Sequence, residues 1–227
     1  LAPAKSGYAF DGWHKQSNYV EQWDFDADVI TSDMTLYAKW IVLHLVSFDS
    51  RGGSGVAAIE VGNGRKLAEP STPIKTGYTF DGWYKEIACI NRWNFSLDDV
   101  ESTRTLYAKW IVQNYTITFN SDGGSTPDPA NKVVTFDQEY GTLPISTRTG
   151  YVFDGWWTGA NGTGTRVTST TEVSNASNQT LYAKWIYHVF TGPAGGLVFY
   201  ENTNWETDGW RYLEAAPAGW SGSTEDP

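Results

Sequence analysis

Two short sequence blocks occur three times in this chain, always in the same order. The first block reads KSGYAFDGW, KTGYTFDGW and RTGYVFDGW, at 5–13, 75–83 and 148–156. The second block, TLYAKW, is identical in all three copies and ends at Trp40, Trp110 and Trp185. Self-similarity with a period of about seventy residues indicates a tandem array of small domains. An array of this kind favours reach and valency over catalysis.

The second copy is complete and predicts about five short strands. LHLVSFDS alternates apolar and polar residues up to the pair Gly52–Gly53, and GVAAIEV follows, which is the pattern of a hairpin. GNGRKLAEPSTP then predicts a turn or one helical turn with an extended lead, and YTFDGWYK predicts a strand interrupted by an Asp-Gly turn or bulge. Trp93 and Phe95, two residues apart, are expected on one face of a strand. TLYAKWIV closes the unit as a strand with one apolar face.

This pattern divides the chain into four segments, namely 1–40, 41–112, 113–187 and 188–227. Pro3 falls where Pro73 falls in the second copy, so we expect a first repeat without its opening hairpin, in a fragment of a longer protein. Such a repeat would leave a sheet edge unpaired. The junctions at Ile41–Val42 and Ile111–Val112 contain no flexible linker. Adjoining modules are therefore expected to touch and to form a semi-rigid, elongated array.

Composition fits a mainly β protein that is held together by aromatic packing. The chain has 12 Trp, 13 Tyr and 10 Phe but a single Cys, so no internal disulfide can staple a domain of this size. Burial of one Trp or Tyr removes about 150–250 Å² from water, worth about 4–6 kcal/mol before the entropy cost. The chain has no apolar stretch of membrane-spanning length. Its net charge of −10 argues against nucleic acid and anionic membranes as partners.

The order of these blocks resembles a known family. FDSxGG, a turn, PxKTGYTFDGWY, WxF and TLYAKW together look like the Listeria-Bacteroides repeat, also called the internalin B-repeat, over residues 1–186. The resemblance implies small β-grasp-like sheet modules without enzymatic activity, found in arrays on bacterial surface and secreted proteins as stalks and sometimes as adhesive surfaces. The third copy departs from the pattern, because Arg166 stands at the offset of Trp23 and Trp93 and the insert TGANGTGT follows the first block.

The tail at 188–227 is similar to a different module. GPAGGLVFYENTNWETDGWRYLEAAP resembles the opening strands of the C-terminal module of a collagen-like adhesin. We expect a glycine turn at Gly195–Gly196, a strand at LVFY and a second strand between Gly209 and Ala215. The module itself is expected to be incomplete.

The residues that could carry chemistry are too scattered for a catalytic or metal site. Asp24, Asp26 and Asp28 have the spacing that opens an EF-hand loop, but the glycine and the glutamate of that loop are missing, so a solvated strand face is expected. The three histidines lack metal-ligand spacing. Cys89 has no histidine nearby in sequence and is expected to be a small apolar filler. We therefore expect no catalytic residue, no cofactor and no metal.

Tyr37, Tyr107 and Tyr182 are the candidates for a ligand surface. Each lies in the TLYAKW block on the sheet face opposite the closing tryptophan, where an exposed ring can stack on a sugar. The recurring tryptophans are expected in the core. Binding would otherwise use the hairpins that differ between copies, 84–96 and 157–168.

Three functions are compatible with these observations. The first is a non-catalytic stalk in a bacterial cell-surface, envelope or secreted protein, which spaces and presents a terminal domain. The second is an adhesive module that binds a host or cell-wall protein or glycan. The third is the non-catalytic part of a larger envelope enzyme. Neighbouring repeats of the same chain are expected as contacts in every case, whereas nucleic acid and membrane insertion are not.

Overall fold

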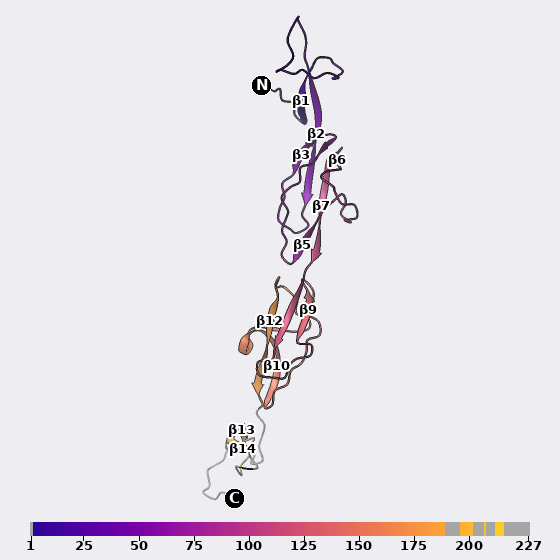
Figure 1. Ribbon diagram of the computed structural model, residues 1–227. Coiled ribbons are helices and arrows are strands. Elements are labelled where there is room, and N and C mark those ends of the chain that lie inside the picture. Colours follow the sequence, from indigo (N-terminus) through magenta and orange to yellow (C-terminus); the bar gives the residue numbers. More distant parts are fainter. Residues whose placement is uncertain (1, 189–195, 202–206, 208–211, 216–227) are drawn as a thin grey trace. The chain divides into compact units, whose positions relative to one another are not determined.

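The computed structural model describes residues 2–188, 196–201, 207 and 212–215 (Figure 1). The chain folds as two compact units, Leu1–Gln113 and Asn114–Pro227. Between residues 2 and 188 the structure consists of strands, turns and a single 3-10 turn, η1 (Ala160–Gly162). The mainly β fold class predicted from the sequence is confirmed.

One long strand dominates the first unit. The strands are β1 (Tyr8–His14), β2 (Tyr37–Asp49), β3 (Ile59–Gly62), β4 (Arg65–Lys66), β5 (Tyr78–Tyr84), β6 (Asp99–Val100) and β7 (Arg104–Val112). The main sheet has the order β1-β2-β7-β5, with β3 paired to β2 and a small β4-β6 ladder beside it.

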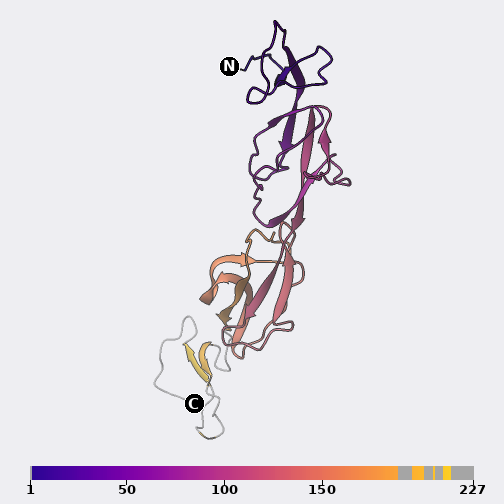
Figure 2. The ribbon, with the colours of Figure 1, turned by 45° about the horizontal axis from the view of Figure 1, so that its top comes forward.

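Strand β2 belongs to two repeats at once. Its first half pairs with β1 as the closing strand of the first copy, where Tyr8 lies opposite Val42. From Leu43 onward the strand pairs with β3 and then, in parallel, with β7, as the opening strand of the second copy. The boundary expected after residue 40 thus lies inside one strand of 13 residues, which Figure 2 shows running from one copy into the next.

The second unit contains the third copy and the tail. Its strands are β8 (Asn114–Asn120), β9 (Asn131–Thr135), β10 (Tyr151–Gly159), β11 (Thr163–Val167), β12 (Gln179–Tyr187), β13 (Leu197–Glu201) and β14 (Tyr212–Ala215). The sheet order is β11-β10-β12-β8-β9, with a parallel pair, β12 and β8, at its centre. β13 and β14 pair antiparallel, so both strands expected in the tail are confirmed. Gly195 of the expected turn, and 209–211 at the start of the expected second strand, lie outside the described residues.

Each GYxFDGW strand carries a β-bulge at its Asp-Gly pair, as the sequence predicted. The register shifts between the Phe and the Gly-Trp pair in all three copies. The bulge glycines, Gly12, Gly82 and Gly155, have φ values of 99°, 142° and 102°. Only glycine adopts such values without strain, which explains its presence in every copy.

The bulge also brings the block's Asp to the Lys of TLYAKW on the neighbouring strand. The three ion pairs are Asp11–Lys39 at 2.8 Å, Asp81–Lys109 at 3.4 Å and Asp154–Lys184 at 3.2 Å. These pairs are partly exposed, so solvent screens each of them. Their recurrence ties the two sequence blocks to one structural role, the pairing of two adjacent strands.

Aromatic rings form the core of the complete copies. In the second copy Phe80 lies 5.4 Å, centroid to centroid, from both Trp83 and Trp110, and the third copy repeats this arrangement. Trp83 and Leu106 are 2% and 0% exposed. The first copy, whose residues 2–40 contain no opening hairpin, leaves Phe25 71% exposed. The opening hairpin therefore supplies much of the cover over the core.

The expected strand through Trp93 and Phe95 is wrong. Asn94–Asp98 is a turn, in which the Asn94 Oδ1 accepts a hydrogen bond from Ser96 N at 2.9 Å and Asp98 Oδ2 accepts one from Asn94 N at 2.8 Å. Side-chain oxygens that bind nearby backbone amides favour turns over strands. Trp93 is nevertheless buried, and its amide donates to the Trp83 carbonyl at 2.8 Å.

The first copy forms the same turn with carboxylates. Asp24 Oδ1 accepts from Asp26 N at 2.9 Å, and Asp28 Oδ2 accepts from Asp24 N at 2.8 Å. The strand expected for these three residues is therefore wrong, because two of the three carboxylates accept hydrogen bonds from the backbone of a turn, but Asp24 and Asp26 are exposed to solvent as expected.

The third copy replaces the middle tryptophan by Val167 rather than by Arg166. Val167 lies opposite Trp156 in the β10–β11 ladder and is 4% exposed. Arg166 instead lies over the bulge glycine Gly155, as Arg92 lies over Gly82 in the second copy. The insert has shifted the alignment by one residue.

Candidate functional site

The three candidate tyrosines occupy equivalent positions in different repeats. Tyr37 is 39% exposed, whereas Tyr107 and Tyr182 are half-buried. Tyr107 pairs with Asp49, at the far end of β2 from Tyr37, which at 3.3 Å per residue separates the two tyrosines by about 40 Å. Tyr182 belongs to the other unit. Each tyrosine must therefore act with its local surroundings.

Tyr182 lines a cleft of about 560 Å³ in the third copy. We call it the β10–β12 cleft. Its walls come from β10, β11, β12 and the loop 168–178. The lining side chains are mostly polar: Tyr140, Thr158, Thr165, Val167, Thr171, Glu172, Ser174, Asn175, Gln179, Thr180 and Tyr182.

The floor of the β10–β12 cleft is a network of side-chain hydrogen bonds that starts at the buried Tyr140. Gln179 donates its Nε2 amide to the hydroxyl of Tyr140, which is 4% exposed. The Gln179 Oε1 in turn accepts from Asn175 Nδ2 at 3.0 Å. Burial raises the pKa of the Tyr140 hydroxyl above its ordinary value. Satisfied networks of this kind fix side chains in one arrangement.

The loop that forms one wall is also held in place. Tyr140 N donates to Thr171 O at 2.9 Å, and Val173 N donates to Gln138 O at 2.8 Å. Val173 is 1% exposed and packs in the core of the copy. The loop is thus anchored by backbone hydrogen bonds and by a buried side chain.

Several polar groups of the cleft remain available. Within the described part of the chain, the hydroxyls of Ser174, Thr180 and Tyr182 and the carboxylate of Glu172 have no hydrogen-bond partner on the protein. Neither Lys nor Arg is among the described residues that line the cleft. The site can therefore donate and accept hydrogen bonds, but it offers no positive charge to an anion.

The insert that distinguishes the third copy builds one side of this cleft. TGANGTGT runs from Thr158 to Thr165, and both end residues line the cleft. The two threonines are joined, since Thr165 N donates to Thr158 Oγ1 at 2.9 Å. Sequence reasoning named Tyr182 together with Tyr37 and Tyr107, and the variable hairpin 157–168, but it named neither Tyr140 nor the rest of the loop 168–178.

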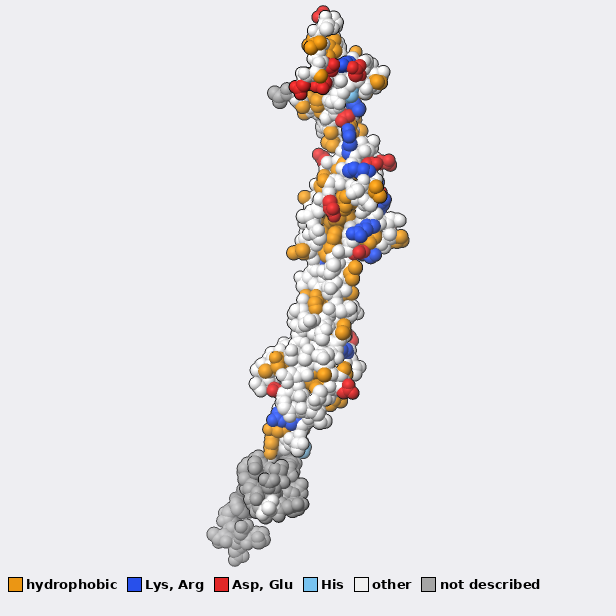
Figure 3. All heavy atoms as spheres, viewed as in Figure 1, with side chains coloured by type: hydrophobic (Ala, Val, Ile, Leu, Met, Phe, Trp, Pro, Cys, Tyr) orange, Lys and Arg blue, Asp and Glu red, His pale blue; other side chains and the backbone are white. Residues whose placement is uncertain are grey.

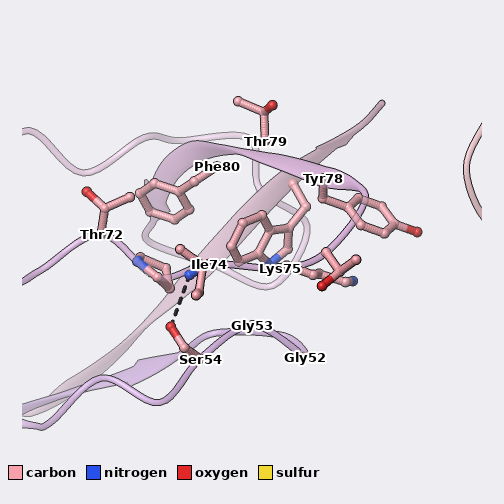
Figure 4. Close-up of a pocket in the computed structure, with 12 residues that line it drawn as sticks. Gly52, Gly53, Ser54, Thr72, Ile74, Lys75, Tyr78, Thr79 and Phe80 are labelled. Atoms are coloured by element: carbon pink, nitrogen blue, oxygen red, sulfur yellow. Dashed lines mark hydrogen bonds between the residues drawn. The ribbon is translucent and has the colours of Figure 1, made fainter. Parts of the chain in front are cut away.

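A second hollow, in the second copy, serves the fold. The groove of about 820 Å³ lies beside Trp110, between Phe80, Tyr78 and the Gly52–Gly53 turn (Figure 4). Trp110 Nε1 donates to Ser50 O at 2.8 Å, and the third copy repeats this bond between Trp185 and Ser121 at 2.9 Å.

A short clamp closes the same groove. Ser54 Oγ accepts from Ile74 N at 3.0 Å, the bond drawn in Figure 4, and Ser54 N donates to Ile74 O at 2.8 Å. The third copy has the equivalent clamp between Ser125 and Thr147. Because the clamp recurs, we assign it to the repeat architecture.

Metal or nucleophile chemistry finds no support in the geometry. Among the described residues, no group of three or more His, Cys, Asp or Glu is placed to hold a metal ion. Cys89 is half-buried, in a loop where its Sγ lies 3.4 Å from Arg51 Nη1. No helix in the described part of the chain has the length and apolar character needed to span a membrane.

Comparison with known proteins gives consistent matches. The sequence model of one protein family, the Listeria-Bacteroides repeat domain, matches residues 1–39, 44–109 and 115–184. A protein of Evansella cellulosilytica, whose name describes a Gly-rich membrane protein, is 37% identical over 196 residues, covering 84% of this chain and 22% of the relative. Internalin H of Listeria monocytogenes is 35% identical over 129 residues, covering 56% of this chain and 23% of the relative. The chain thus spans about a quarter of the length of these relatives.

Proposed function

Because the chain belongs to the Listeria-Bacteroides repeat family, we propose that it is a non-catalytic stalk segment of a bacterial surface or envelope protein. The names of its relatives, which include membrane proteins and an internalin, support a place at the cell surface or envelope. In this role the segment spaces and presents another part of the parent protein, so it needs stability and stiffness rather than an active site.

The observation that carries the proposal is the shared strand β2. A hinge between the first two copies would require a break in the sheet, but the ladder with β1 ends at Val42 and the ladder with β3 begins at Leu43. Short contacts reinforce this junction. Leu43 N donates to Gly7 O at 2.9 Å, and Asn63 N donates to Val42 O at 2.8 Å. Bending between these copies would break several backbone hydrogen bonds together.

A side-chain bridge spans the same junction. Arg65 Nη2 of the second copy donates to Asp11 Oδ1 of the first at 3.0 Å, while Lys39 holds the other oxygen at 2.8 Å. The hydrogen bond from Lys39, with the charges of Lys39 and Arg65, keeps the pKa of Asp11 below its ordinary value. The bridge adds orientation to the covalent continuity of β2.

Spin labels can test the stiffness of this junction. Labels would be attached at Ser17→Cys and Glu101→Cys in a Cys89→Ala background, since both sites are exposed. We expect a narrow distance distribution by pulsed electron paramagnetic resonance. A five-residue Gly-Ser insertion between Val42 and Leu43 is the matched control, and it should broaden the distribution. A broad distribution in the chain without the insertion would contradict the stalk proposal.

Small-angle scattering tests the whole array. A compact globule of this length has a radius of gyration of about 17 Å. The proposal requires a radius of gyration clearly above that of the globule. It also requires the narrow distribution of label distances, because a flexible chain raises the radius of gyration as well. A value near that of a globule would refute the proposal.

A further inference from the structure

We propose that the β10–β12 cleft of the third copy is a binding site for a short, uncharged saccharide. This inference goes beyond the stalk role and does not depend on it. It rests on three observations, which are a polar cleft with an anchored wall, free hydrogen-bonding groups on its walls and an aromatic ring at its side.

The free groups match the chemistry of sugar hydroxyls. A sugar hydroxyl both donates and accepts, so it needs partners of both kinds. The hydroxyls of Ser174, Thr180 and Tyr182 can do either, and the Glu172 carboxylate accepts only. The volume of about 560 Å³ lies within the usual range of small-ligand sites. Four available groups that converge on one cleft can replace the water shell of several hydroxyls at once.

The ring of Tyr182 is the stacking surface. Trp157, directly opposite Tyr182 on β10, is covered by Lys184, whose Nζ lies 4.2 Å from the ring centroid. Tyr182 is half-buried and lines the cleft, so it presents an aromatic surface there. A flat ring beside convergent hydroxyls favours the apolar face of a pyranose.

Charge and apolarity exclude other ligand classes. An anionic ligand, such as a phosphate or a uronic acid, would meet Glu172 without any lining Lys or Arg in the described cleft. Charged side chains are also sparse over the face of the third copy that Figure 3 shows. A peptide that docks through its side chains would need apolar pockets. Val167, the aliphatic residue of the lining, is 4% exposed and offers no such pocket.

The cleft belongs to the part of the repeat that varies. Thr158 and Thr165 come from the insert of the third copy, and Gly164, with φ of 78°, allows the tight turn between them. A Cβ on Gly164 would lie 2.3 Å from Thr158 Oγ1, so this wall requires the glycine. The insert therefore shapes the cleft without changing the parallel pair β8 and β12 at the sheet centre.

Titration of the full chain with defined oligosaccharides tests the proposal. The probes are chitohexaose, cellohexaose, xylohexaose and mannohexaose, with tetragalacturonate as the charged comparison, followed by amide NMR. We expect at least one neutral probe to shift amides in 158–182 with a Kd of about 1 mM or tighter. Tetragalacturonate should bind at least about tenfold more weakly. A stronger response to the charged probe would overturn the assignment.

Three substitutions locate the site. Tyr182→Ala should weaken binding about tenfold to 100-fold, because stacking and one hydrogen bond are lost, while Tyr182→Phe keeps the ring and should weaken it about threefold to tenfold. Tyr107→Ala, at the equivalent position of the second copy, should leave the affinity unchanged. The proposal fails if no neutral probe shifts these amides at about 10 mM, or if Tyr107→Ala weakens binding as much as Tyr182→Ala. If the amide spectrum of Tyr182→Phe without sugar matches that of the unchanged chain, the variant is folded, and its weaker binding is due to the lost hydroxyl.

Discussion

Substitution of Gly53 by Ala separates two reasons for a glycine, which are space and backbone conformation. Its backbone does not adopt a positive φ, but an added Cβ would lie 2.4 Å from Trp110 Cζ2 and 3.2 Å from Ile74 O. Carbon atoms in contact lie about 3.5–4.0 Å apart. The indole cannot retreat freely, because its Nε1 donates to Ser50 O and its ring packs 5.4 Å from that of Phe80.

We expect Gly53→Ala to destabilise this region by about 2–4 kcal/mol. Overpacking of a well-filled site costs about 1–3 kcal/mol, and loss of the indole hydrogen bond adds about 1 kcal/mol. Hydrogen exchange gives a local readout, because Ser54 N donates to Ile74 O at 2.8 Å beside the substitution. Its exchange rate should rise about 30-fold to 1,000-fold.

Matched variants decide whether the clash is the cause. Gly55→Ala has no neighbour within 4 Å of the new Cβ and should change little. Gly124→Ala should reproduce the effect in the third copy, since its Cβ would lie 2.3 Å from Trp185 Cζ2. Trp110→Phe removes Cζ2, so the double variant with Gly53→Ala should cost less than the sum of the two changes. Additive costs, or equal costs for Gly53→Ala and Gly55→Ala, would refute the reasoning.

Two further predictions concern acid stability and the core. A hydrogen bond from Tyr84, with Lys109 nearby, lowers the pKa of Asp81 below its ordinary 3.8. Because the pKa of Asp81 is lower in the folded than in the unfolded chain, its carboxylate stabilises the fold at pH values above the unfolded pKa. This stabilisation is lost as the pH falls through the folded pKa. Asp81→Asn should therefore flatten the acid dependence of urea unfolding below about pH 5; an unchanged slope would contradict this. Leu106→Ala, at a fully buried site, should cost about 2–5 kcal/mol in denaturant unfolding, whereas Leu36→Ala, at the equivalent half-buried site, should cost less than about 2 kcal/mol; equal costs would count against the difference in packing.

The recurring blocks could be predicted because their structure is local. Alternation in TLYAKW reports directly which residues face the core, and Leu106 and Ala108 are 0% exposed as that pattern requires. The Asp-Gly pair signals a bulge because glycine adopts positive φ values without a side-chain clash. Neither inference needs a distant part of the chain.

The failures arose where side chains compete with the backbone. Spacing of two between Trp93 and Phe95 fits a strand, but Asn94 and Asp98 bind backbone amides and close a turn instead. The candidate site shows a different limit of sequence reasoning. The sequence places Tyr182 on a sheet face, but Tyr140, whose hydroxyl meets Gln179 beneath the cleft, precedes it by about forty residues, and periodicity does not report such a contact.

Placement of the variable segment at a sheet edge explains how one copy can diverge without loss of the fold. β11 is the edge strand in the order β11-β10-β12-β8-β9, so extra residues between β10 and β11 lengthen a hairpin and break no central ladder. The same insertion in the junction strand β2 would separate the ladder with β1 from the ladder with β7 and would disturb two repeats. The chain can therefore vary at β11, whereas the shared strand must keep its length and register.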